Sequence, residues 1–264
     1  MAQLLTAADG LLRGRWRAKE ELGAGRISTS AGLLAAIGLA AGAIYGCSMG
    51  LYGLLRPGHA TWKQVLADAA KVPLLFLLTL VVGFPSLYAF SALANSKLRF
   101  GDTLKLLLVA VAVNLVLLAS FAPVTAFFTV STNSYPFMVL LNCVFFGLSG
   151  AIGLGILRRA LNEVFASDSI GRCPEAAPAG ADAETVRRAE AARSEWARAR
   201  SEGNRPRRIF AAWFAIYGLV GSQMGWILRP FIGSPGLEFQ LFRPREGSFF
   251  EGFFRALGQF LLGS

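Results

Sequence analysis

The sequence predicts an all-α integral membrane protein, a bundle of about five transmembrane helices with amphipathic surface helices at both ends. Hydrophobic residues make up 54% of the 264-residue chain and charged residues only 16%, whereas soluble domains carry about 25% charged residues. Five apolar runs along the chain are long enough to cross a bilayer, for which about 20 helical residues suffice. The basic residues flank these runs, as membrane topology requires.

We attribute the net charge of +10 to the basic residues that flank the apolar runs. Because this placement suits a membrane surface, we expect contact with anionic lipid and no nucleic-acid partner. The cysteines Cys47, Cys143 and Cys173 and the single histidine, His59, do not have metal-ligand spacing. We therefore expect no metal and no cofactor. The Ala, Arg and Gly bias indicates a GC-rich bacterium, so the expected location is the bacterial inner membrane.

Residues 1–30 are expected to form a cytoplasmic segment, with an amphipathic helix over residues 2–17 on the membrane surface. A four-span bundle follows at residues 31–157, and its first span lies at about Leu33–Leu55. Glycines recur there at intervals of four residues, which places them on one helix face where another backbone can approach closely. The spacing leaves open whether the partner helix belongs to the same chain. These helix-packing residues are Gly38, Gly42, Gly46 and Gly50.

The second span is expected at about Val72–Leu93. A short amphipathic lead-in precedes it and begins with a capping box formed by Thr61 and Gln64. Pro85 interrupts the later half of the span and predicts a kink beside a packed interface.

The third and fourth spans each contain one polar amide. They are expected at about Leu104–Val130, with Asp102 as the N-cap, and at about Pro136–Leu157. Asn114 and Asn142 lie within them. A buried amide in a membrane usually forms a hydrogen bond with another helix, and contact with a solute is the alternative.

Residues 158–208 are a large polar segment, which we expect to be a cytoplasmic arm. Asp182 is expected to cap a helix rich in Ala, Glu and Arg that continues to about Glu202. Glu184 and Arg188 support this helix as an i,i+4 pair. Because the helix has no wide apolar stripe, we interpret it as a solvated arm that is available to a cytosolic partner.

The last part of the chain is expected to contain a fifth span at residues 209–233 and an exported segment at residues 234–264. A capping box of Ser248 and Glu251 begins a helix over residues 249–262, which is too short to cross the membrane. We expect it to lie in the outer interface or in a groove of a partner protein. The residues predicted to contact a partner or lipid are Gln223, Trp226, Arg229, Arg243, Arg245, Phe249, Phe250, Phe253 and Phe254.

Positive charges predict the orientation of the bundle. Lys and Arg gather in the N-terminal segment, in the loop at residues 95–103 and in the arm, whereas the turn between the third and fourth spans has none. The N-terminus is therefore expected in the cytoplasm and, with five spans, the C-terminus in the periplasm. The loop at residues 56–71 fits least well, because it places three positive charges outside.

Motifs for catalysis are absent from the sequence, which has no P-loop, no G-x-S-x-G and no H-E-x-x-H. No charged residue lies at the centre of an expected span, where proton and ion carriers usually need one. We therefore expect no enzymatic activity. The favoured function is a non-catalytic scaffold or assembly subunit that binds other membrane proteins, a second copy of itself or lipid. The alternative is a component of a small-solute or ion channel or transporter.

Two apolar stretches, followed by a tight turn, resemble the Yip1-type family of integral membrane proteins: KVPLLFLLTLVVGFPSLYAFSAL (Lys71–Leu93) and GDTLKLLLVAVAVNLVLLASFAPV (Gly101–Val124). The resemblance covers about residues 30–157 and the fifth span, and it implies a cytoplasmic N-terminus followed by five spans. A later stretch, GSQMGWILRPFIGSPG (Gly221–Gly236), is similar to part of a group of bacterial membrane proteins that have no assigned function. Neither resemblance implies catalytic residues.

Overall fold

The structure is a computed structural model, which describes residues 9–10, 30–55, 62–93, 100–169, 182–202, 204–228 and 247–262. These residues are almost entirely helical and include no strand. Their long helices are α3 (Ala31–Leu54), α4 (Trp62–Leu93), α5 (Phe100–Ser131), α6 (Tyr135–Ser169), α7 (Ala183–Glu202), α8 (Asn204–Leu228) and α9 (Phe249–Leu262).

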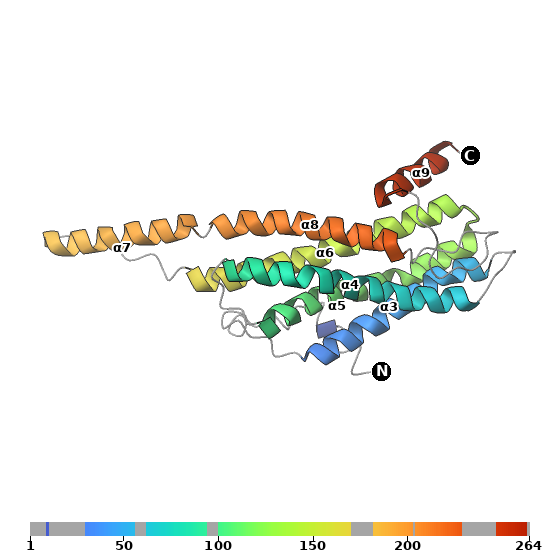
Figure 1. Ribbon diagram of the computed structural model, residues 1–264, viewed down its shortest axis with the longest axis horizontal. Coiled ribbons are helices and arrows are strands. Elements are labelled where there is room, and N and C mark those ends of the chain that lie inside the picture. The colour runs from blue at the N-terminus through green and yellow to red at the C-terminus, as the bar shows by residue number, and fades with distance from the viewer. Residues whose placement is uncertain are drawn as a thin grey trace.

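Helices α3 to α6 are long and apolar enough to cross a membrane, so the chain is an integral membrane protein. They lie side by side and alternate in direction (Figure 1). Helix α8 packs along α4, and α7 continues the line of α8 beyond one end of the bundle. Helix α9 lies near the opposite end of the bundle, against α6.

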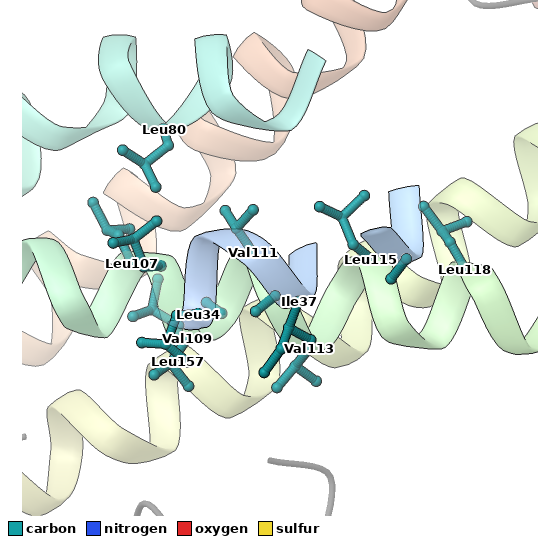
Figure 2. Packing of buried hydrophobic residues seen from close by; sticks show 14 of the residues in the cluster. Leu34, Ile37, Leu80, Leu107, Val109, Val111, Val113, Leu115, Leu118 and Leu157 are labelled. Carbon is teal, nitrogen blue, oxygen red and sulfur yellow. The ribbon is translucent and has the colours of Figure 1, made fainter. Parts of the chain in front are cut away.

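Helix α5 is the centre of the bundle. Every residue from Leu106 to Val113 is buried, so this part of the helix is enclosed around its whole circumference. A helix that is apolar on all sides needs neighbours on all sides, and α3, α4 and α6 supply them. Figure 2 shows Leu34 of α3, Leu80 of α4 and Leu157 of α6 in the one buried cluster that surrounds α5.

The glycine face of α3 packs against helices of the same chain. A Cβ at Gly42 would lie 3.0 Å from the Cβ of Pro73, and a Cβ at Gly50 would lie 2.6 Å from the Cα of Val65. A Cβ at Gly46 would overlap the backbone oxygen of Asp68 and lie 2.7 Å from the Cα of Ala69. The backbones of α3 and α4 therefore meet without side chains between them along three successive turns. Gly38, on the same face, contacts α5 instead, because a Cβ at Gly38 would lie 3.3 Å from Leu115 Cδ1.

The start of α4 differs from the prediction. Residues 62–71 are not a separate lead-in; they are the first turns of one continuous helix that reaches Leu93. Thr61 lies outside the described residues, so the predicted capping box stays a prediction; the Nε2 of Gln64 donates to both carboxylate oxygens of Asp68, at 3.0 and 2.9 Å. Asp68 is fully buried and Lys71 is only 7% exposed. Close contact with α3 turns this polar segment into part of the helix interface.

Other helix ends also differ. Helix α5 begins at Phe100, so Asp102 lies in its first turn and is not the N-cap. Helix α6 continues past Leu157 to Ser169. Helix α8 begins at Asn204 and ends at Leu228, and the rest of the predicted fifth span lies outside the described residues, as do Thr61 and almost all of the predicted N-terminal surface helix.

The arm helix α7 forms as the sequence predicts. Asp182 caps it by accepting a hydrogen bond from the backbone N–H of Thr185 at 3.3 Å. Together with a bond from the Thr185 hydroxyl, this contact lowers the pKa of Asp182, because both bonds stabilise the carboxylate. Glu184 and Arg188 form the expected i,i+4 ion pair on its surface.

We predict that Gly46→Ala destabilises the bundle by about 1–3 kcal/mol, because the added methyl group meets the backbone of α4, which cannot move aside locally. The measurement is the free energy of unfolding in mixed detergent micelles. Gly32→Ala, in the first turn of the same helix, is the control, since a Cβ there meets nothing within 4 Å. Equal stability of the two variants would contradict the tight α3–α4 contact.

Candidate functional site

A cavity of about 350 Å³ lies between α4, α5, α6 and α8. Its lining residues on α4, α5 and α6 come from near the middle of each helix, so the cavity lies at mid-height in the bundle; those on α8 come from its C-terminal half, and Phe249 is the first residue of α9. The lining residues are Leu75, Phe76, Thr79, Ala110, Val111, Asn114, Cys143, Phe146, Gly147, Gly150, Ala151, Gly153, Leu154, Leu157, Tyr217, Gly218, Gly221, Ser222, Gly225 and, from α9, Phe249.

Glycines of α6 and α8 make the space. A Cβ at Gly147, Gly150 or Gly218 would meet nothing within 4 Å, in contrast to the crowded glycines of α3. The missing side chains therefore leave room here and do not bring two backbones together. Gly147 and Gly218 are exposed, so the cavity opens sideways between α6 and α8.

Helix α8 is held against α4 on one side only. The indole Nε1 of Trp213 donates to Ser86 Oγ at 2.8 Å, and Trp213 is only 2% exposed. The ring of Tyr217 occupies the place where Gly83 has no side chain, and it stacks on Trp213 with ring centroids 4.9 Å apart. Contact between α8 and α6 is slight in comparison. The cavity is the space that this one-sided attachment leaves open.

Asn142 has a structural role. Its Oδ1 accepts a hydrogen bond from the hydroxyl of Tyr45 at 2.6 Å, and its Nδ2 donates to the carbonyl of Met138 at 2.8 Å. Tyr45 and Asn142 are both fully buried. This bond joins α3 to α6, which is the interhelical role expected for a buried amide in a membrane.

Asn114 differs, because its Oδ1 is buried and has no hydrogen-bond partner. The side chain lines the cavity, and Gly153 of α6 lies close to it, since a Cβ at Gly153 would be 3.2 Å from the Cβ of Asn114. Two hydroxyls in the lining are already occupied: Thr79 donates to the carbonyl of Leu75 at 2.8 Å and Ser222 to that of Leu219 at 2.7 Å. Asn114 is therefore the lining residue with a buried oxygen that has no partner, and Cys143 and Tyr217 add a thiol and a hydroxyl to the lining.

The electrostatics of the site favour an uncharged ligand. None of the residues that line the cavity carries a formal charge, and an ion in such surroundings would lose its hydration without compensation. Among the residues that the structure describes, no group of three or more His, Cys, Asp or Glu side chains could hold a metal ion.

The predicted contact residues near the C-terminus are only partly brought to this site. Phe249 lines the cavity, Phe253 and Gln223 are half-buried, and Phe250 and Phe254 are 45% and 63% exposed. The side chain of Trp226, and Arg229, Arg243 and Arg245 as a whole, lie outside the described part of the chain.

Helix α9 begins as predicted. Ser248 Oγ accepts from the backbone N–H of Glu251 at 3.4 Å, and Glu251 also pairs with Arg255 at 3.2 Å. Gly247, just before the helix, has a φ of 77°, a conformation that favours glycine. At its other end α9 rests on α6, where the rings of Phe260 and Phe137 are 6.0 Å apart.

Two of the features that define the cavity have no strong signal in the sequence. The pairing of Gly83 with Tyr217 and the open glycines of α6 depend on how α8 is placed, and single glycines in apolar helices are common in membrane proteins. Gly218, Gly221 and Gly225 are spaced by three and four residues, less regularly than the glycines of α3, but this spacing is the one sequence signal that could have identified the α8 wall of the cavity.

We predict opposite effects for the two asparagines. Asn142→Leu should destabilise the bundle by about 1–3 kcal/mol, since it leaves the buried Tyr45 hydroxyl without its acceptor. Asn114→Leu should leave stability unchanged or raise it, because it removes a buried oxygen that has no partner. Unfolding in mixed micelles measures both. A large loss for Asn114→Leu would show that this amide has a structural partner.

Comparisons of the chain with protein-family models, with curated proteins and with solved structures find no match. The resemblance to Yip1-type proteins stays a prediction.

Proposed function

We propose that this chain is a non-catalytic membrane scaffold or assembly subunit whose cavity between α6 and α8 binds a lipid-soluble molecule. The observation that carries the proposal is an apolar cavity at mid-height that opens sideways, where acyl chains would surround the bundle. Its volume of about 350 Å³ falls within the usual range of small-molecule sites. Molecules reach such an opening from within the bilayer and need not cross water.

Two helices outside the four-span bundle, α7 and α9, support a role in assembly. Helix α7 is an exposed helix of 20 residues and reaches about 30 Å beyond α8. At the other end, α9 has an exposed apolar side with Phe250, Phe254 and Leu261, while Glu251, Arg255 and Gln259 form a separate polar strip. We propose that α9 runs from the cavity, which Phe249 lines, to the first turn of α6 at Phe137, with its apolar side in lipid.

The proposed topology has five spans, with α8 as the fifth, the N-terminus in the cytoplasm and the C-terminus in the periplasm. Two observations favour it. Helix α7 extends beyond one end of the bundle, and α9 lies beside the other half of it (Figure 1). Lys71, which counted against this orientation as a loop charge, is buried in α4 near Asp68, with which it interacts electrostatically, so it does not act as a surface charge.

Solute transport is the second candidate function, and one observation favours it: the unpaired Oδ1 of Asn114 beside a cavity. Asn142 no longer supports transport, because it binds Tyr45. If the protein carries a solute, Asn114→Leu should abolish flux into proteoliposomes. Absence of any flux by the unsubstituted protein excludes this candidate.

We predict that a phospholipid with a diazirine in the middle of one acyl chain labels the cavity residues of α5 and α6 in proteoliposomes. Gly150→Phe should reduce this labelling at least about fivefold, because the ring fills space that is empty at Gly150. Gly155→Phe is the matched control, since Gly155 also has nothing within 4 Å but does not line the cavity. Equal labelling of both variants, read by mass spectrometry, would exclude the cavity as the lipid site.

The topology has its own test. Alkaline phosphatase, which is active only outside the cytoplasm, should be active when fused after Ser264 and inactive when inserted in the arm beside Asp182. Activity at both positions, or at neither, would contradict a fifth crossing between them.

A further inference from the structure

We propose that the ligand of this cavity is a neutral hydroxyl compound dissolved in the membrane, an alcohol or phenol whose O–H donates a hydrogen bond to Oδ1 of Asn114. The inference rests on the proposed function, because it names the ligand of the same cavity. It goes further in assigning a recognition group and in separating this ligand from the phospholipids of the bilayer.

The first step is the need for a donor. A buried amide oxygen without a partner is costly in an apolar environment, and Asn114 Oδ1 has none. No side chain of the lining supplies this donor in the structure. Thr79 and Ser222 each donate their single hydrogen to a carbonyl of their own helix, and neither the Tyr217 hydroxyl nor the Cys143 thiol forms a hydrogen bond with Oδ1. A ligand in the cavity can therefore supply the donor.

The second step is the charge and chemical type of the ligand. No charged side chain lines the cavity, so a phosphate, carboxylate or ammonium group has no counter-ion there. Hydrocarbons offer no hydrogen bond, and ethers and esters only accept. Neutral, lipid-soluble molecules that donate to an amide oxygen carry an O–H or an N–H group, and hydroxyl compounds are the class with a single donor, which matches one unpaired oxygen.

The third step is depth and size. Asn114 lies near the middle of α5, so its partner must sit near the centre of the bilayer. Phospholipid headgroups stay at the two surfaces, about 15 Å away, whereas a neutral alcohol or phenol can dissolve in the hydrocarbon core. The cavity has room for about a dozen water molecules, which suits one ring or part of one chain. Phe76 and Phe146, stacked with centroids 6.0 Å apart, offer it an aromatic wall.

The test uses an alkylphenol photoprobe that carries a diazirine, with the full-length protein in phosphatidylcholine vesicles. Two competitors differ only at the donor: 4-octylphenol has the O–H group, and 4-octylanisole has a methyl ether in its place. At equal membrane concentration, the phenol should displace the probe about three- to tenfold better than the ether, the preference that one hydrogen bond in a membrane provides.

Asn114→Leu should remove this preference, so that the two competitors act alike, while Gly150→Phe should remove labelling altogether. Ser120→Leu, an exposed polar position on the same helix that does not line the cavity, should keep the preference. Equal competition in the unsubstituted protein, or a preference that survives Asn114→Leu, overturns this inference. If the acyl-chain probe still labels the cavity in that case, the proposed function survives; if neither probe labels it, both fail.

Discussion

The contact between α3 and α4 is the constraint on which the rest of the bundle depends. Gly42, Gly46 and Gly50 have no side chains, so the two backbones meet directly over three turns. This close approach allows α5 to be covered by α3 and α4 as well as by α6, and its turns from Leu106 to Val113 are then buried on every side. Helix α8 packs mainly on the outer surface of α4, and the space beside α6 stays open.

Glycine therefore serves two opposite purposes in this protein. In α3 it allows contact, and any larger residue meets the neighbouring backbone. In α6 and α8 the same residue leaves space, because nothing approaches Gly147, Gly150 or Gly218. A regular spacing of four identifies the first use, since it aligns the glycines on one face. The second use has no spacing rule, because it depends on where a neighbouring helix fails to reach.

Local patterns in the sequence predict the elements of this fold better than their relations. Four apolar spans, the cap at Asp182 and the helix that follows Ser248 depend on hydropathy and capping, which act over a few residues. Whether residues 62–71 belong to the packed part of α4 depends instead on α3, which covers them and buries Asp68. Asn114 and Asn142 look alike in the sequence and differ only because Tyr45 is placed beside one of them. Four helices form the cavity together, so no single segment of the sequence predicts it.

The burial of Asp68 and Lys71 bears on how the protein enters the membrane during synthesis. A helix that carries two charged groups is expensive to expose to lipid on its own. Helix α4 follows α3 in the chain, so the segment that covers Asp68 leaves the ribosome first. The ribosome therefore synthesises α3, which covers Asp68, before it synthesises α4. Helix α4 can then leave the insertion machinery already paired with α3 as a helical hairpin.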